Sequence, residues 1–367
     1  MSGEKINYIG GDLELDLEFF SKPELNRHEE YFLFNKAKDY ALVSMGRDAL
    51  KLALLTEGLR AGDEVLIPSF LCVKVIDVLE ELNLKYRLFN IEEGFEVVSD
   101  HLLSMISEKT KAVIFINYFG YSSPDFHLME TIKGKGKNIA IILDYAQALF
   151  SITEAVLKSP FVDYVVTSLR KFLPVPDGAF LIANKKQINQ GAILQQTRRA
   201  VFERGLGKIV KNYYLNSAHQ NISMEQLHLD LVCQSEKHFD LEQGVYGMSA
   251  LSCELLKHID FEVVATQRKK NTKYLYEHLD TAMLPKWDGK TVLLVVPVLL
   301  KNRDRVRSLL MKQNIYLPIH WPIDERIDRE KHPVAHQLAE RELGLVIDQR
   351  YGLEDMKYLT ENFKEVA

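Results

Sequence analysis

Short apolar runs alternate with helix-periodic segments through the first half of the chain. Apolar residues recur at helical spacing in residues 46–59 and 71–82, and each of these segments leads into a compact apolar run. The runs that we predict as strands are residues 64–68, 85–91, 111–119, 139–144, 163–168 and 179–184. Strands that are apolar on both faces and separated by helices are typical of a mainly parallel sheet covered on both sides. The pattern therefore predicts an α/β fold.

The pattern changes in the second half of the chain. Residues 187–280 are polar and helical in spacing, with few strand signals. They are followed by an apolar run at residues 291–300 and by helical patterns at residues 303–314, 334–345 and 353–367. This pattern is typical of a compact α/β domain. We predict a large domain over residues 25–240 and a smaller C-terminal domain over residues 241–367, with residues 1–24 packed at the domain or subunit interface.

Composition and charge narrow the range of functions. The 367 residues carry a formal net charge of −5, and the basic residues are scattered among acids, so nucleic-acid binding is not indicated. The three cysteines lie far apart without a CxxC pair, which argues against a disulfide framework or a zinc site. The N-terminus does not resemble a signal peptide, and no apolar stretch approaches the ~20 residues that span a bilayer. We expect a cytoplasmic protein that binds neither metal nor membrane.

Candidate chemistry lies where the predicted strands end. Asp144 ends a buried strand, where an unpaired carboxylate is costly and requires a cationic partner. Lys171 lies just after another strand, and a lysine in a partly desolvated pocket loses its proton easily and becomes a nucleophile toward aldehydes. Gly46 begins a predicted helix whose free N–H groups can hold a phosphate, and Arg47 adds positive charge. Together these features indicate a site for pyridoxal 5′-phosphate (PLP).

The order and spacing of these residues resemble the DegT/DnrJ/EryC1/StrS family of PLP-dependent sugar aminotransferases, which have fold type I. The segments that carry the resemblance are "GDEVLIPSF", "EKTKAVIFINYFGY", "ILDYAQA", the lysine segment, "YGMSALSCELL", "LPIHWPI" and "HPVAHQLAERELGLVI". The resemblance implies a large domain with a mainly parallel, seven-stranded-type sheet between helices, and a smaller C-terminal α/β domain. It also implies a homodimer with shared active sites, which moves an amino group from glutamate or glutamine to a keto-sugar, ordinarily a nucleotide-linked one.

The resemblance assigns a role to each candidate residue. Lys171 would bind the cofactor covalently and relay a proton between the amino acid and the cofactor. Asp144 would bind the pyridine nitrogen and keep it protonated, because a close carboxylate favours the charged form. Gln147 would hydrogen-bond the cofactor's 3-oxygen or pack beside the ring.

Further residues complete the expected site. Gly46 and Arg47 would hold the cofactor phosphate with help from Ser168. His320, in "IHWP", and Tyr118, in "INYFGY", would contact the substrate.

The chain also departs from the family pattern. Cys72 stands where many members carry an aromatic residue that stacks on the cofactor ring, and we include it among the cofactor-binding residues. The phosphate-binding serine usually stands five residues before the lysine, where this chain has Val166, and Ser168 is the nearest substitute. Gly247 replaces the arginine of an Arg-Met-Ser signature. These departures keep two alternatives open: an aminotransferase with a non-nucleotide substrate, and a non-catalytic protein that binds cofactor or sugar for regulation.

Taken singly, the same residues have simpler interpretations. Lys171 alone fits a surface lysine, Asp144 a helix N-cap, Cys72 a small buried hydrophobe and His320 a structural histidine. Gly46 alone is a turn glycine, and the remaining polar residues are ordinary surface groups. "SLRK", "GKGKN" and "HPVAH" lack the companion residues of a penicillin-binding, dinucleotide-binding or metalloprotease motif. Only the combination points to a cofactor site.

Overall fold

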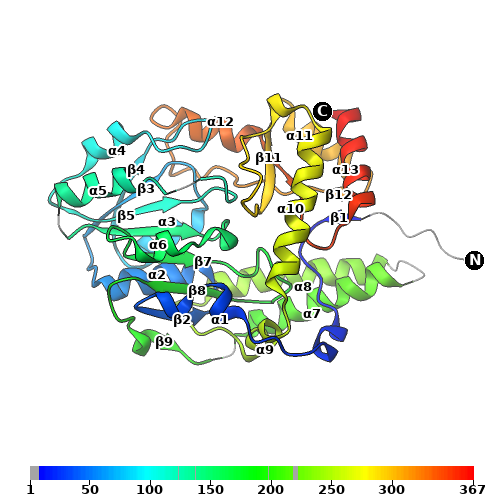
Figure 1. Ribbon diagram of the computed structural model, residues 1–367, viewed down its shortest axis with the longest axis horizontal. Coiled ribbons are helices and arrows are strands. Elements are labelled where there is room, and N and C mark those ends of the chain that lie inside the picture. The colour runs from blue at the N-terminus through cyan, green and yellow to red at the C-terminus, as the bar shows by residue number, and fades with distance from the viewer. Residues whose placement is uncertain (1–7, 123, 137, 197, 218–221) are drawn as a thin grey trace, which may run out of the picture.

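A computed structural model describes residues 8–122, 124–136, 138–196, 198–217 and 222–367. In Figure 1 the main sheet and its helices occupy one side of the molecule, and the long helices α7 and α8 extend from it side by side. The C-terminal helices and a second, small sheet lie above them. None of the helices in the described part of the chain is both long and apolar enough to cross a membrane.

The main sheet has seven strands in the order β2-β8-β7-β6-β5-β3-β4. These are β2 (Asp39–Val43), β3 (Glu64–Pro68), β4 (Lys85–Phe89), β5 (Thr110–Ile116), β6 (Ala140–Tyr145), β7 (Tyr164–Thr167) and β8 (Ala179–Ala183). Strand β8 pairs antiparallel with both β2 and β7, and the other pairings are parallel. The predicted mainly parallel α/β sheet is confirmed, and the sequence pattern missed only β2.

Both faces of this sheet are buried, as its continuous apolar strands predict. In β3, Val65 and Ile67 belong to one apolar cluster, whereas Leu66 between them belongs to the cluster on the other face. The helices in this part of the chain are α1 (His28–Tyr31), α2 (Gly46–Glu57), α3 (Val73–Glu81), α4 (Ser99–Met105), α5 (Phe126–Lys135) and α6 (Glu154–Lys158). Parallel strands aligned in this way place all their carboxyl ends, and the residues that follow them, at one edge.

The rest of the chain is mostly helical. It comprises α7 (Arg199–Asn216), α8 (Ile222–Leu241), α9 (Ala250–Lys257), α10 (Phe261–His278), α11 (Arg303–Met311), α12 (Pro333–Arg341) and α13 (Leu353–Val366). Strands β11 (Val295–Leu299) and β13 (Glu342–Val346) form a two-stranded antiparallel sheet. The remaining strands are short: β1 (Ile9–Gly10) with β12 (Ile315–Tyr316), and β9 (Ile193–Leu194) with β10 (Val245–Tyr246). Short 3-10 helices lie at Leu17–Ser21, Phe34–Lys36, Leu149–Ser151, Gln190–Ala192 and Thr281–Met283.

One sequence prediction is wrong in this region. Residues 334–345 were expected to be helical throughout, but α12 ends at Arg341 and the following residues form β13. A Cβ on Gly344 would lie 2.9 Å from Cγ2 of Val295, so the two strands approach too closely there for a larger residue. Pairing with β11 therefore overrides the helical pattern.

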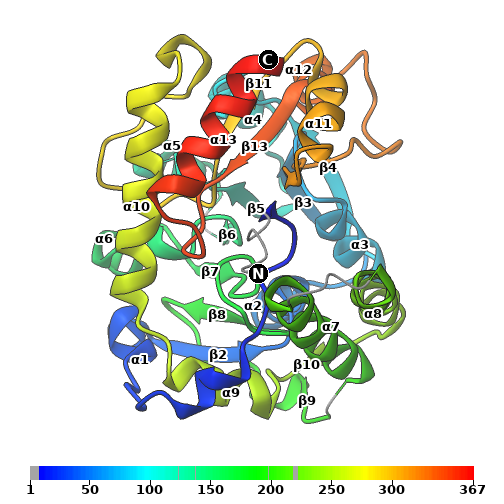
Figure 2. The same cartoon turned by 90° about the vertical axis from the view of Figure 1, so that its right-hand side faces the viewer.

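Helix α10 connects the two ends of the molecule. Figure 2 shows it running along one side, from the level of β2 to the level of β11. The N-terminal segment also contacts both parts, because Asp12 pairs with Lys208 of α7 and Glu14 pairs with Arg350 ahead of α13. The first seven residues lie outside the described residues. The domain boundary near residue 240 stays a prediction.

Candidate functional site

All of the predicted cofactor-binding residues, together with Lys171, line one cavity at the carboxyl edge of the main sheet. Its lining consists of Met45, Gly46, Arg47, Leu50, Cys72, Lys74, Val75, Ile116, Asp144, Ala146, Gln147, Ser168, Arg170, Lys171 and Trp321. We call it the lysine–aspartate cavity. It brings together the carboxyl ends of β3, β5, β6 and β7 and the start of α2.

Asp144 lies near the end of β6, where its carboxylate borders the cavity but is otherwise surrounded by protein. The Ala146 backbone N–H donates a hydrogen bond of 2.9 Å to Oδ1. Burial raises the pKa of Asp144, and this N–H and Lys171 oppose the rise only in part. The cationic partner that the sequence requires is therefore not supplied in full by the described residues, and Asp144 forms no ion pair with any of them.

Lys171 lies in the loop between β7 and β8. Leu169 closes this loop by donating its N–H to the Gly178 carbonyl, at 2.9 Å, and it accepts backbone bonds from Phe172 and Leu173. Burial lowers the pKa of Lys171, and Asp144 and Cys72 oppose this only partly. A lysine with a lowered pKa is a better nucleophile near neutral pH.

The lysine loop is anchored by residues that sequence reasoning did not select. Asp177 is completely buried and accepts hydrogen bonds of 2.6 Å from the hydroxyls of Ser249 and Ser252. Ser249 also caps α9 by accepting the Ser252 N–H. The segment "YGMSALS" thus fixes the loop that carries Lys171. The two serines three residues apart were the only sequence signal for this anchor.

Gly46 allows helix α2 to begin against the end of β7. A Cβ on this residue would lie 3.0 Å from the Thr167 carbonyl oxygen and 3.8 Å from Cβ of Ser168. Among the described residues, no acceptor bonds the backbone N–H of Gly46 or Arg47, as expected in the first turn of a helix. These N–H groups border the cavity and favour an anion there.

Arg47 lines the cavity, but its guanidinium is engaged elsewhere. It pairs with Asp240 of α8 at 2.5 Å, and Lys74 pairs with the same carboxylate at 3.0 Å. The sequence predicts that the positive charge of Arg47 binds a phosphate. In the structure this charge is at least partly balanced by Asp240 of α8.

Gln147 and Ser168 are buried polar residues of the cavity lining. Oε1 of Gln147 accepts the Phe119 backbone N–H at 3.3 Å. Its Nε2 is buried and has no hydrogen-bond partner in the described part of the chain, a costly arrangement unless a ligand supplies the acceptor. This orphaned donor, the cradle at Gly46 and the uncompensated Asp144 all fit a cofactor with a phosphate, a ring oxygen and a ring cation.

An aromatic residue from the C-terminal part of the chain also lines the cavity. Trp321 packs against Phe70, with ring centroids 5.4 Å apart, and the Lys171 ammonium lies 5.8 Å from its ring centroid. Cys72, which stands where many members of the family have an aromatic residue, lines the same cavity. Sequence reasoning chose His320 and overlooked Trp321 beside it.

The two predicted substrate residues lie outside the lysine–aspartate cavity. Tyr118 is only 1% exposed, and its hydroxyl donates to the Phe70 carbonyl at 2.5 Å, so it belongs to the core. Its contact with substrate stays a prediction. His320 lines a neighbouring cavity. Its backbone N–H donates to Glu342 at 2.6 Å, and its Nδ1 lies 3.5 Å from the same carboxylate.

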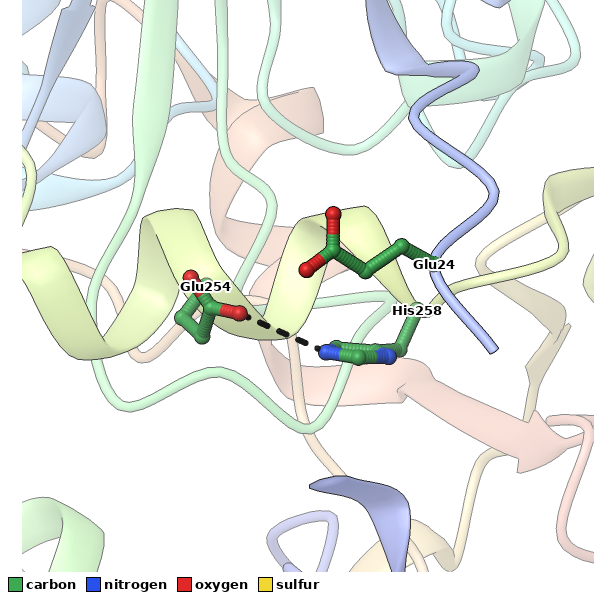
Figure 3. Close-up of side chains that lie close together, drawn as sticks. All are labelled: Glu24, Glu254 and His258. Carbon is green, nitrogen blue, oxygen red and sulfur yellow. Dashed lines mark ion pairs between the residues drawn. The ribbon is translucent and has the colours of Figure 1, made fainter. Parts of the chain in front are cut away.

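A separate group has side chains of metal-binding type. Glu24, Glu254 and His258 lie within 4.8 Å of one another by their ligand atoms, and Figure 3 shows the ion pair between Glu254 and His258. The other ring nitrogen of His258, Nδ1, contacts the Lys22 carbonyl at 2.7 Å. These contacts tie the N-terminal segment to α9, and none of the three residues lines the lysine–aspartate cavity.

Comparisons with known proteins agree with this architecture. The profile of the DegT/DnrJ/EryC1/StrS aminotransferase family matches residues 19–155. GDP-perosamine synthase of Escherichia coli O157:H7 is 20% identical over 378 residues, covering 100% of this chain and 96% of that protein. A pleiotropic regulatory protein of Geobacillus stearothermophilus is 21% identical over 350 residues, covering 90% and 86%. The crystal structure of NtdA from Bacillus subtilis with bound cofactor PMP has a TM-score of 0.64 at 14% identity, covering 99% and 88%.

The seven-stranded mixed sheet, flanked by helices and followed by a second small sheet, is the fold of the fold-type-I sugar aminotransferases. The chain is therefore similar to the DegT/DnrJ/EryC1/StrS aminotransferase family over residues 19–155, and similar at low identity to full-length relatives.

Proposed function

We propose that this protein is a PLP-dependent aminotransferase that moves an amino group from an amino-acid donor to a keto-sugar. The observation that carries the proposal is the lysine–aspartate cavity, in which a lysine of lowered pKa and a carboxylate of raised pKa border the same space. Perturbed groups that converge in one cleft are typical of catalytic sites. The name of the relative GDP-perosamine synthase supports a nucleotide-linked keto-sugar as the acceptor.

The chain's own residues supply the binding and proton-transfer functions. When bound, PLP supplies an electron sink for the carbanion that forms at the α-carbon of the amino acid. Lys171 would hold the cofactor through its amine and, once released by the donor, would move the proton from that α-carbon. Asp144 would hold the proton on the ring nitrogen, and Gln147 Nε2 would donate to the ring oxygen.

The phosphate would be bound mainly by neutral donors. The free N–H groups of Gly46 and Arg47 and the hydroxyl of Ser168 border the same part of the cavity. Oriented N–H groups at a helix N-terminus bind phosphate without a full positive charge. Because the Arg47 guanidinium forms an ion pair with Asp240, we expect the Arg47 side chain to contribute less to phosphate binding than the sequence predicts.

A regulatory, non-catalytic function is the second candidate. It is favoured by the Arg47–Asp240 pair, which leaves the phosphate site with fewer free cations, and by the relative named as a pleiotropic regulatory protein. Such a protein would keep its cofactor or sugar bound without turning over amino acids.

Reduction with borohydride tests the cofactor site, and an assay of amine transfer separates the two functions. We expect the purified protein to show a visible absorption band that borohydride abolishes, with peptide mass spectrometry finding the cofactor on Lys171. Lys171→Ala should carry no attached cofactor and transfer no amine, whereas Lys185→Ala, a partly exposed lysine outside the cavity, should match wild type.

The outcomes distinguish the two candidates. Attachment to Lys171 together with keto-acid release from glutamate supports the aminotransferase. Attachment without release from any of a panel of amino acids supports the regulatory function. Attachment at another lysine, or none, contradicts the proposed site.

A further inference from the structure

Two carboxylates and an imidazole converge away from the lysine–aspartate cavity, where the N-terminal segment meets the end of α9. They belong to Glu24, Glu254 and His258, and we call them the Glu–His cluster. Each offers one potential ligand atom, and these atoms all lie within 4.8 Å of one another. Figure 3 shows Glu24 reaching in from the N-terminal segment and the other two from the helix. The fold therefore gathers three groups that can bind one metal ion.

Backbone hydrogen bonds hold Glu24 in this position. The N–H groups of the next two residues, Leu25 and Asn26, both donate to the Lys257 carbonyl, at 2.6 and 3.1 Å. The side-chain amide of Asn26 also donates to Oε2 of Glu24 at 3.1 Å. Ligands that are ordered before binding cost less to immobilise than mobile ones. The chain thus presents the Glu24 carboxylate to α9 although it is exposed.

The imidazole of His258 is oriented toward the carboxylates. This residue is only 8% exposed, and its Nδ1 lies 2.7 Å from the Lys22 carbonyl oxygen. Because a carbonyl oxygen can only accept, Nδ1 must carry a proton, which directs the other nitrogen, Nε2, toward Glu254. Histidines that bind metal ions commonly donate one ring N–H to a carbonyl in this way while the second nitrogen binds the ion.

The distance between Nε2 of His258 and Oε1 of Glu254 is 3.5 Å. This is longer than an ordinary hydrogen bond, but it is close to the separation of neighbouring ligands in a tetrahedral site, which is about 3.3–3.4 Å for metal–ligand bonds of about 2.0–2.1 Å. Two lone pairs at this distance repel each other unless a proton or a metal ion lies between them. A proton on Nε2 serves one carboxylate, whereas a metal ion is shared with Glu24 as well.

The charge of the cluster also favours a cation. Lys257 pairs with Glu254 at 2.6 Å and its charge also acts on Glu24, so one ammonium faces two carboxylates. It contacts Oε2 of Glu254, which leaves Oε1 facing His258. A partly exposed ion pair of this kind contributes little and competes weakly with a metal ion. The last turn of a helix adds the negative end of its dipole.

We propose that the Glu–His cluster binds a divalent transition-metal ion of the zinc class, through Nε2 of His258 and one carboxylate oxygen each of Glu24 and Glu254, with water as the fourth ligand. An imidazole among carboxylates suits zinc or manganese, whereas magnesium and calcium prefer sites made of oxygen alone. The sequence predicts no metal, because these ligands are far apart along the chain and form no spaced motif.

A metal ion here would join the N-terminal segment to α9. The start of the same helix carries Ser249 and Ser252, whose hydroxyls hold Asp177 of the lysine loop. The ion would therefore stabilise the helix that anchors this loop without touching the cofactor, because no ligand of the cluster lines the lysine–aspartate cavity. Its role would be structural.

The test compares Glu24→Gln with Glu18→Gln. Both variants replace an exposed glutamate of the N-terminal segment by a neutral amide of the same size, but only Glu24 belongs to the cluster. Zinc is titrated by calorimetry into the full-length protein after treatment with a chelator. We expect wild type and Glu18→Gln to bind alike and Glu24→Gln to bind at least about 10-fold more weakly, since loss of an outer-shell partner alone costs about 10–100-fold. Zinc should also raise the melting temperature of wild type more than that of Glu24→Gln.

X-ray absorption at the zinc edge identifies the ligands. We expect nitrogen and oxygen neighbours with one imidazole, and Glu254→Gln should weaken binding as Glu24→Gln does. Sulfur neighbours would show that a cysteine binds the zinc and would overturn the inference. Equal affinities of wild type and Glu24→Gln would do the same, and so would a wild type that binds no zinc, which leaves a protonated His258 paired with Glu254. None of these results bears on the attachment of cofactor to Lys171, which is tested separately.

Discussion

Trp321 is the residue whose placement changes the interpretation of the cofactor site most. An aromatic residue was missing from the position of Cys72, and Trp321 lines the same cavity from a segment far along the chain. Trp321 lines the lysine–aspartate cavity, whereas the adjacent His320 lines the neighbouring cavity.

Fluorescence can test the contact between Trp321 and the cofactor, because the chain has only two tryptophans. The other, Trp287, packs on Tyr276 with ring centroids 5.4 Å apart and does not line the cavity. In Trp287→Phe, which keeps Trp321, we expect cofactor binding to quench the emission strongly, because the bound ring would lie in contact with the indole. In Trp321→Phe most of the emission should remain. Trp321→Leu should weaken cofactor binding by about 1 kcal/mol, and equal quenching in both phenylalanine variants would contradict the contact.

Asp144 leads to a prediction about pH. Because burial raises its pKa above the ordinary 3.8, the folded cofactor-free protein loses stability as the pH rises through that raised pKa. Asp144→Asn cannot ionise, so it should melt at a higher temperature than cofactor-free wild type at neutral pH, and the gain should shrink as the pH falls toward 3.8. With cofactor the order should reverse, because Asn cannot balance a ring cation. Calorimetry of both forms across the pH range checks this, and a variant that is less stable at every pH without cofactor would count against it.

At the scale of elements, the junction of α2 with β7 decides whether a phosphate can be held. Gly46 allows the helix to start against the Thr167 carbonyl, which places the free N–H groups beside Ser168. The strand order brings this junction next to β6, so the phosphate donors and Asp144 lie in one cavity.

Two glycine substitutions test this junction. In Gly46→Ala the new Cβ would lie 3.0 Å from a backbone oxygen that cannot move easily, so we expect a loss of about 1–3 kcal/mol in stability. Cofactor affinity should also fall, because the helix start is displaced. Gly134→Ala is the matched control: it lies exposed in α5 with no atom within 4 Å of the new Cβ, and it should gain up to about 1 kcal/mol from helix propensity. Chemical denaturation and cofactor titration measure both effects, and unchanged affinity in Gly46→Ala would argue against a phosphate at this helix.

At the scale of the whole molecule, the α7–α8 pair carries an exposed apolar surface. It carries many of the exposed large apolar side chains, namely Phe202, Leu206, Tyr213, Ile222, Leu227, Leu229 and Leu241. Figure 1 shows the two helices extending together from the body of the protein. Two other residues of these helices, Arg204 of α7 and Glu236 of α8, line the cavity that His320 and Lys171 also line. We therefore expect this pair to form the interface of the predicted homodimer, since an apolar surface of this kind marks a contact site.

One substitution on this surface tests the dimer. Phe202 is 67% exposed on α7, and burying an aspartate in its place should weaken self-association by about 2 kcal/mol or more. Val263→Asp, at a 62% exposed apolar position on α10, is the control and should leave the association unchanged. Light scattering over a range of concentrations measures both. A monomeric wild type, or equal effects of the two variants, would show that α7 and α8 do not form a dimer interface.

The sequence by itself determined six of the seven strands of the main sheet, the alternation of strands with helices, and the positions of Lys171 and Asp144 at or just after strand ends. These features follow from local periodicity and from the rule that parallel strands end at one edge. Gly46 was selected as the start of a predicted helix, and Gln147 and Ser168 were selected through the family resemblance, which relies on short local motifs. These are short-range properties of the chain.

The tertiary structure alone decided which distant groups complete the site. Arg47 pairs with Asp240, 193 residues away, and two arginines from α10 and α11 meet in one cavity. The strand β13 exists because β11 offers it backbone partners, although its residues continue a helical pattern. Such contacts depend on how helices and strands pack against one another. They join residues that are far apart in the sequence, and no local sequence pattern indicates which of these residues will meet.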